Sequence, residues 1–402
     1  MEIDIKEPMN PGDAGAGRAV SRLLDAAAQL APASASALVD EVCQVLSATA
    51  GRLYAADYSL RRLQQVDRSG PVGEPQPIAG TIAGRAFMSR EVVVSESNPT
   101  VVSVPLIDGS NRIGVLELEY ERWDGAVPDV LDRVVAVFVL ILVANNRYSD
   151  FWARARRSEP LSAAAEIQWD VLPPLSCSTS DVAISGILEP AYSIGGDSFD
   201  YALNGRWLEF AIVDAIGHDM SAVLMSAAAI NGLRNFRRAG TDVSVAYNEV
   251  DQLIASQFGD SFYVTGQIGA LDVATGTLTW VNAGHMPPML VRNGTYAGEL
   301  ECAPSMPLGL GGPVAEVATA SLQRGDRVLF YTDGITESRS PDGAFFGRDR
   351  LSDFLVRSTL EQVDVAETVR RLALSVVDYV GVGLRDDATL LLIEYRGADQ
   401  ST

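Results

Sequence analysis

Four aspartates beside apolar segments are the residues of this chain whose types and spacing suggest chemistry. Asp214 closes the apolar run 208–213, which predicts a buried strand, and Asp197 follows a Gly-Gly turn. Asp333 ends a second apolar run, and Asp387 opens a third. Each one alone could equally be a turn residue. As a set, carboxylates at strand ends beside glycine predict a site for a hard cation, which prefers charged oxygen ligands.

Five short motifs contain or separate these aspartates, in the order GGDSFDY, VDAIGHD, NAGH, FYTDG and DDATLL. In this order they resemble the SpoIIE-like branch of the metal-dependent type 2C (PPM) serine/threonine phosphatases, from about Val171 to Arg396. The resemblance implies an α+β fold with two packed β-sheets flanked by paired helices. It also implies two Mn²⁺ or Mg²⁺ ions, which in such sites lie about 3.5–4 Å apart and activate a water molecule for attack on phosphorus.

The resemblance gives the individual residues roles in metal binding and catalysis. Asp214 becomes the ligand that both ions share, and Asp333 and Asp387 become ligands of one ion. Asp197 supports the other ion, and the main-chain carbonyl of Ala215 is an additional ligand.

Some residues beside these motifs have roles that the sequence leaves open. Asp386 adjoins Asp387 and either replaces it as a ligand or supports it by a hydrogen bond. Arg339 and Arg385 follow and precede ligand turns and are candidate contacts for a phosphoryl group.

The two histidines of the chain, His218 and His285, lie in glycine-flanked turns. A histidine with a pKa near ~6.5 could protonate a leaving serine alkoxide. However, type 2C enzymes of eukaryotes carry their histidine closer to the bridging aspartate than His218 lies to Asp214. A structural turn role therefore stays open for both histidines, and Asp219 is predicted to cap the following helix.

Composition excludes several other classes of protein. The net charge of −21 argues against nucleic-acid binding, and Lys6, the only lysine, leaves no core lysine for a P-loop, a kinase or a Schiff base. Three cysteines far apart predict neither a disulfide framework nor a metal site. The longest apolar run, 134–144, is shorter than the ~20 residues of a membrane span. We therefore expect a cytoplasmic protein without a membrane segment.

The segments outside the phosphatase-like region predict a second domain. We expect a loose tail over residues 1–17, a domain over 18–148, a helical connector over 149–170 and the phosphatase domain over 171–397. The pieces IAGRAFMSREVVV and SVPLIDGSNRIGVLELE resemble a GAF sensor domain. No ligand signature is present in it, and Cys43 falls on the apolar face of a helix, as a small core residue would. The helix Val130–Arg147 is apolar nearly all round, which predicts a homodimer.

These observations predict a phosphoprotein phosphatase in signal transduction. In the SpoIIE-like family the usual substrate is a phosphorylated STAS-type anti-sigma-factor antagonist, so the resemblance implies regulation of a sigma factor under control of the GAF-like domain. Two alternatives stay open: a metal-dependent phosphatase for small molecules, and a non-catalytic sensor that binds a partner. Loss of a ligand aspartate would be the mark of the latter, and all four are present.

Overall fold

The structure is a computed structural model that describes residues 11–29, 37–122, 130–193, 195–217, 219–259, 261–381, 383–384 and 386–397. The chain divides into an N-terminal unit, residues 1–160, and a C-terminal unit, residues 161–402. Within the described ranges, no helix combines the length and the apolar character needed to cross a membrane.

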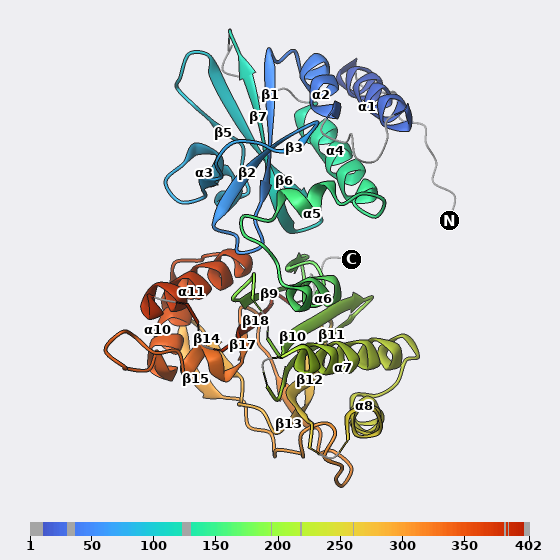
Figure 1. Ribbon diagram of the computed structural model, residues 1–402, viewed down its shortest axis with the longest axis vertical. Coiled ribbons are helices and arrows are strands. Elements are labelled where there is room, and N and C mark those ends of the chain that lie inside the picture. Colours follow the sequence, from blue (N-terminus) through green and yellow to red (C-terminus); the bar gives the residue numbers. More distant parts are fainter. Residues whose placement is uncertain are drawn as a thin grey trace. The chain divides into compact units, whose positions relative to one another are not determined.

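The N-terminal unit is an antiparallel sheet covered by helices on both faces (Figure 1). Its strands run in the order β3-β2-β1-β7-β6-β5, with β4 also paired to β2. The strands are β1 (Ala50–Ala56), β2 (Arg62–Asp67), β3 (Gly70–Pro71), β4 (Gln76–Pro77), β5 (Val93–Val94), β6 (Thr100–Asp108) and β7 (Asn111–Tyr120). The helices are α1 (Pro11–Gln29), α2 (Leu38–Leu46), α3 (Ile82–Ser89), α4 (Leu131–Asn145) and α5 (Phe151–Ala155). Helices α1, α2 and α4 share one apolar core with the sheet.

Two features of this unit bear on the sequence-based predictions. The expectation of a loose tail up to Gly17 is wrong for residues 11–17, because α1 begins at Pro11. Proline is favoured in the first turn of a helix, and alanines follow it.

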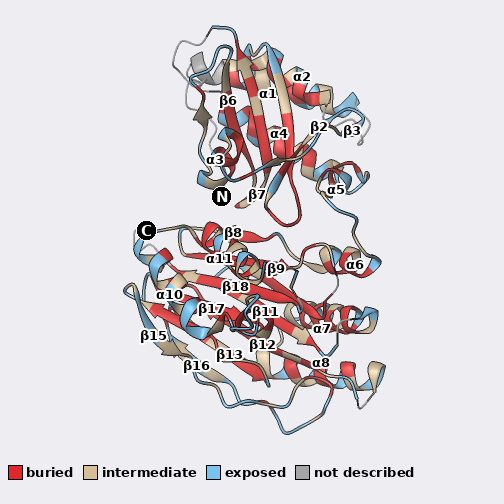
Figure 2. Cartoon of the chain, turned by 60° about the vertical axis from the view of Figure 1, so that its left-hand side comes forward, coloured by how far each residue is buried: buried red, intermediate tan, exposed pale blue. Residues whose placement is uncertain are grey.

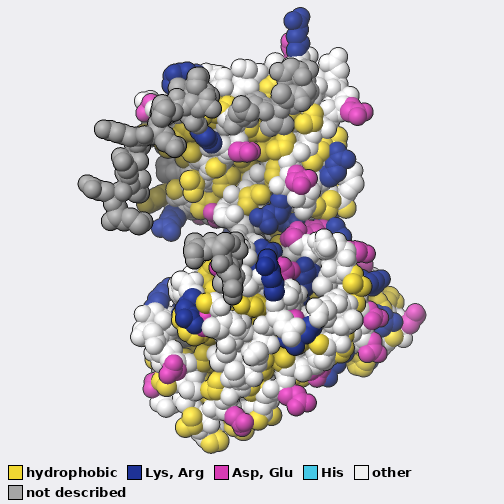
Figure 3. Space-filling view, turned by 180° about the vertical axis from the view of Figure 1, so that it is seen from behind, with side chains coloured by type: hydrophobic (Ala, Val, Ile, Leu, Met, Phe, Trp, Pro, Cys, Tyr) yellow, Lys and Arg dark blue, Asp and Glu magenta, His cyan; other side chains and the backbone are white. Residues whose placement is uncertain are grey.

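On α4, Leu140 is 63% exposed although the residue types around it are apolar. Figure 3 shows that hydrophobic side chains also gather on the surface of this unit.

The C-terminal unit contains two antiparallel sheets. The first has the order β10-β11-β12-β13-β16, and the second has the order β15-β14-β17-β18-β9-β8. The strands of the first sheet are β10 (Asp197–Asn204), β11 (Trp207–Ala215), β12 (Val264–Asp272), β13 (Thr277–Ala283) and β16 (Ala318–Ser321). Those of the second are β8 (Ser176–Ser178), β9 (Val182–Glu189), β14 (Met289–Arg292), β15 (Thr295–Glu299), β17 (Arg327–Tyr331) and β18 (Ala388–Tyr395).

Helices flank the two sheets, and the strands between them are largely buried (Figure 2). The helices are α6 (Ala163–Val171), α7 (Met220–Arg238), α8 (Val243–Phe258), α9 (Asp333–Thr336), α10 (Gly347–Leu360) and α11 (Val365–Val380). Helices α7 and α8 share a core with the first sheet, and α11 packs on β9 and β18 of the second. The rings of Phe210 and Phe330, one from each sheet, lie 4.7 Å apart between centroids. This is the predicted sandwich of two sheets flanked by helices.

Local signals set the boundaries of α7, which follows Asp214 near the end of β11. Asp219 caps the helix, because its Oδ1 accepts hydrogen bonds from the main-chain N–H groups of Ser221 and Ala222. The small and apolar residues of its inner face, among them Ala222 and Met225, are fully buried. The predicted capping role of Asp219 is confirmed.

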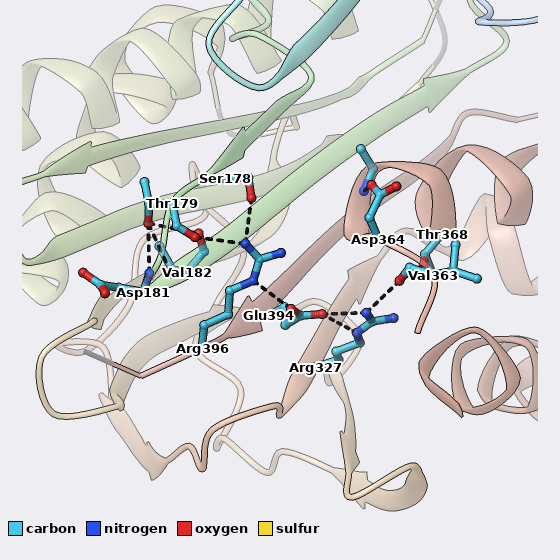
Figure 4. Close-up of polar contacts among 11 residues, drawn as sticks. Ser178, Thr179, Asp181, Val182, Arg327, Val363, Asp364, Thr368, Glu394 and Arg396 are labelled. Carbon is cyan, nitrogen blue, oxygen red and sulfur yellow. Dashed lines mark hydrogen bonds and ion pairs between the residues drawn. The ribbon is translucent and has the colours of Figure 1, made fainter. Parts of the chain in front are cut away.

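A polar network holds the second sheet at the end away from Asp387, which precedes the start of β18 (Figure 4). Glu394, near the end of β18, accepts hydrogen bonds from Arg327 on β17 and from Arg396. Arg396 also donates to the hydroxyl of Ser178, and Arg327 to the main-chain oxygen of Val363. These bonds fix neighbouring strands and the loop before α11, and so stiffen the scaffold.

Candidate functional site

Asp197 and Asp214 face each other across two neighbouring strands. Asp197 is the first residue of β10, and in the antiparallel ladder it pairs directly with Asp214 on β11. The sequence did not predict β10, whose first residues include two aspartates and a serine, so it lacks the apolar pattern of a core strand. The side chain of Asp197 is nevertheless 2% exposed.

Three neighbours fix Asp197. Its Oδ2 accepts a hydrogen bond of 2.7 Å from the hydroxyl of Thr332. Its main-chain N–H donates to Oδ2 of Asp387 over 3.2 Å, and its main-chain oxygen accepts from Nε2 of Gln168 over 2.5 Å. Thr332 also accepts from the main-chain N–H of Thr389, so it joins β10 to the second sheet. Sequence reasoning missed Thr332 and Gln168; the position of Thr332 directly before Asp333 was the only signal.

The Gly-Gly turn before Asp197 allows the chain to approach the other site residues closely. A Cβ atom on Gly195 would lie 1.1 Å from Oδ2 of Asp387, and one on Gly196 would lie 2.3 Å from the main-chain oxygen of Ala215. The main-chain N–H of Ala215 donates to the oxygen of Gly196. Any side chain at either glycine would displace a predicted ligand. We call this close approach of Gly195 and Gly196 to the two oxygen atoms the glycine cradle.

Burial and mutual repulsion raise the pKa values of the site carboxyls. Burial, then the charge of Asp333, raises the pKa of Asp214 to about 7. The pKa of Asp197 is raised well above its ordinary value by burial and by the charges of Asp214 and Asp387. The pKa of Asp333 is raised by burial and by Asp386. Closely spaced buried carboxyls of this kind are stabilised by a cation.

Asp386 and Asp387 differ in their surroundings. Asp387 is 5% exposed and its carboxylate is held against the Asp197 main chain. Asp386 is exposed, accepts a hydrogen bond from the main-chain N–H of Asp387, and contributes to the raised pKa values of Asp214 and Asp333. Asp386 is thus as much a candidate ligand as Asp387, which the sequence had favoured.

For His285 the structure favours the structural turn role over the catalytic one. His218 lies outside the described residues. The Nε2 of His285 lies 3.1 Å from the main-chain oxygen of Tyr331, and its Nδ1 lies 3.0 Å from the hydroxyl of Thr265. Because a carbonyl can only accept, Nε2 carries the proton and Nδ1 accepts from Thr265. Burial lowers the pKa of His285 to about 4, so it is a neutral structural group rather than an acid for catalysis near pH 7.

The residues fit a hard divalent cation by their chemistry. Within the described ranges, no three acidic, histidine or cysteine side chains lie close enough to hold an ion as they stand. The fit rests instead on three observations: the set consists of oxygen donors, its carboxyls raise each other's pKa values, and the glycine cradle brings a carbonyl and a carboxylate to Asp197. Oxygen-only sets of this kind suit Mg²⁺ or Mn²⁺.

Comparison with known proteins points to one family. Residues 204–396 match the model of Stage II sporulation protein E (SpoIIE). Protein IcfG of Synechocystis sp. is 23% identical over 58% of this chain and 41% of its own length. Phosphoserine phosphatase RsbU of Bacillus subtilis is 22% identical over 58% of this chain and 69% of its own length. The chain therefore spans less than half of IcfG.

A solved structure is also similar. The RsbU and RsbW domains of Rv1364c from Mycobacterium tuberculosis are 26% identical, with a TM-score of 0.47, over 56% of this chain and 63% of that one. The family match falls on the C-terminal unit, which carries the ordered motifs and the two-sheet sandwich. The C-terminal unit is therefore similar to the SpoIIE family over residues 204–396.

Proposed function

We propose that this protein is a metal-dependent phosphoprotein phosphatase that hydrolyses phosphoserine or phosphothreonine on a STAS-type anti-sigma-factor antagonist. The observation that carries the proposal is that Asp197 pairs with Asp214 across neighbouring strands, while its main-chain N–H donates to the carboxylate of Asp387. The name of the relative RsbU, a phosphoserine phosphatase, supports the reaction type.

Asp197, Asp214, Asp333 and either Asp386 or Asp387 are the carboxylates that would hold two Mn²⁺ or Mg²⁺ ions, with the carbonyl of Ala215. When bound, such ions activate water and neutralise charge on the phosphoryl oxygens. The chain itself positions the donors. Thr332 and Gln168 hold the side chain and the main chain of Asp197, so its carboxylate is oriented before a substrate arrives.

The N-terminal unit has the proposed role of a GAF-like sensor that controls this site and forms the homodimer. Helix α6, the first element of the C-terminal unit, supports the control, since its residue Gln168 contacts the site. The exposed apolar residues of α4 support the dimer.

The test is a phosphate-release assay with the full chain and Mn²⁺. Phosphorylated STAS proteins are compared with the same proteins phosphorylated on a nonphysiological site and with free phosphometabolites. We expect turnover of a STAS phosphoprotein that stops when a chelator is added. Preference for a free metabolite would favour the small-molecule phosphatase, and binding without hydrolysis would favour the sensor.

A further inference from the structure

A pocket of about 360 Å³ lies beside Asp386 and the turn that follows Asp333, and it has no role in the metal site described above. Gly334, the neighbour of Asp333, and Asp386 line one part of it, and Glu337 adds a second acidic side chain. A phosphate ester is itself an anion, so these carboxylates would repel it. A basic side chain in this pocket would offset that repulsion in addition to the metal ions.

Arg339 is the single basic side chain among the described residues that line this pocket. It is exposed, and within the described part of the chain it forms no ion pair. Its guanidinium lies over the ring of Phe345, 4.1 Å from the centroid. Stacking on the ring face leaves the N–H groups at the guanidinium edge available for a second partner.

The segment that carries Arg339 is a short hairpin with many hydrogen bonds. Arg339 pairs with Phe345 in an antiparallel bridge, and Ser340 bonds to Ala344 and Gly343 through its main chain. The hydroxyl of Tyr379 donates to the main-chain oxygens of Ala344 and Phe345. The arginine is thus presented by a fixed turn.

The hairpin is also tied to the loop of Asp333. The hydroxyl of Ser338 donates to the main-chain oxygen of Gly334 over 2.6 Å, and the N–H of Phe346 donates to the oxygen of Ser338. Phe346 is 3% exposed and packs edge-on against the ring of Tyr379. These contacts connect the position of Arg339 to that of the ligand turn.

We infer that Arg339, held by Phe345, binds the phosphoryl group of the substrate at the mouth of the acidic site. The inference rests on the proposed function and specifies its substrate-binding residue. A guanidinium edge matches two phosphoryl oxygens in a bidentate pair, and it offsets the repulsion from Glu337 and Asp386. Arg339 acts in binding, so its loss raises KM and the inhibition constant of phosphate and has little effect on kcat.

The experiment uses the full chain with Mn²⁺ and p-nitrophenyl phosphate. For Arg339→Ala we expect KM and the inhibition constant of inorganic phosphate to rise together by about 5- to 20-fold, which lies between the effect of an exposed ion pair and that of a hydrogen bond to a charged group. Arg339→Lys, which keeps the charge but not the fork, recovers part of this loss. Phe345→Leu removes the stack and raises both constants by a smaller factor.

Arg324→Ala is the matched control, because it removes the same charge from an exposed arginine of the same unit that lines no part of this pocket. It leaves both constants unchanged, and Mn²⁺ affinity measured by calorimetry is unchanged in all the variants. Unchanged KM and phosphate inhibition in Arg339→Ala, or a fall in kcat alone, overturns the inference. A wild-type chain that hydrolyses no phosphate ester overturns the proposed function instead.

Discussion

Gln168 on α6 donates a hydrogen bond from Nε2 to the main-chain oxygen of Asp197 over 2.5 Å, and it is 3% exposed. A longer bond of 3.4 Å runs from the same nitrogen to the oxygen of Gly195. The first helix of the C-terminal unit is therefore in direct contact with the turn that places the first site carboxylate. A shift of α6 would move Asp197 relative to Asp214.

Replacement of Gln168 by leucine should weaken the metal site. The change leaves a buried main-chain oxygen without its donor, which costs about 1–3 kcal/mol. We expect lower Mn²⁺ affinity by calorimetry together with lower stability. Trp169→Phe is the control, since it removes a hydrogen bond from the same helix to the oxygen of Ala191 and should leave Mn²⁺ affinity unchanged. Equal affinities in Gln168→Leu and the wild type would contradict the idea.

Asp214→Asn should abolish activity by removing charge from the centre of the carboxylate set. We expect a loss of at least ~10³-fold in turnover, as for other key electrostatic groups, and loss of Mn²⁺ binding in calorimetry. Asp219→Asn makes the same chemical change five residues later, where asparagine caps a helix as well as aspartate does. That control should retain full activity. Wild-type activity in the presence of excess chelator would disprove the metal mechanism.

Removal of the N-terminal unit should change the regulation of the phosphatase domain. The fragment has to begin at Leu161 rather than near Val171, because α6 packs on α7 and supplies Gln168. A typical coupling of ~1–3 kcal/mol would alter metal or substrate affinity about 5- to 150-fold. Metal affinity and turnover on one phosphoprotein are measured for the full chain and the fragment. Identical values, also with Val223→Ala or Leu224→Ala on α7, would mean that the N-terminal unit exerts no control.

Leu140→Glu should convert the proposed homodimer into a monomer. Leu140 is 63% exposed on α4, and Ala136 and Ala144, one turn on either side, are exposed as well. A charge in the centre of an apolar interface is costly because it loses its hydration. Light scattering would report the 42.9 kDa of one chain instead of twice that mass. Leu24→Glu, at a leucine 51% exposed on α1, is the matched control and should stay dimeric.

His285 should make the stability of the protein depend on pH between about 4 and 6.5. In the folded chain its pKa is lowered from 6.5 to about 4, so between these pH values the unfolded chain binds more protons. Stability from this group is therefore present at pH 7 and is lost as the pH falls, by about 3 kcal/mol in all.

Urea unfolding of the wild type and His285→Gln at pH 7 and pH 4.5 provides the measurement. The carboxyls with raised pKa values have the opposite dependence, but they are common to both proteins, so the difference isolates His285. The wild type should lose more stability than the variant on acidification. A constant difference between the two proteins at both pH values would show that His285 titrates normally.

The sequence by itself determined the elements whose signals are local. Helices Met220–Arg238 and Val243–Phe258 have the bounds that the apolar spacing and the preceding aspartates predict. The strands Met289–Arg292 and Thr295–Glu299 follow from the Asn-Gly turn between them. The ordered motifs indicated the family resemblance and the aspartates, because each motif is a short run whose residue types can be read without the tertiary structure.

Only the tertiary structure decided how those turns meet. Asp197 and Asp387 are 190 residues apart in the chain, and no local pattern states which strands pair. The sequence did not predict strand β10, because the polar residues at its start are buried by partners from distant segments. It did not predict β16 either, because β16 is a short strand at the edge of its sheet. Burial and hydrogen bonds between distant segments decide the neutral state of His285 and the contact of Gln168 with Asp197. They also decide that Asp387 is buried while Asp386, its neighbour, is exposed. The residue types supplied the donors, and the packing of two sheets and α6 decided which of them lie together.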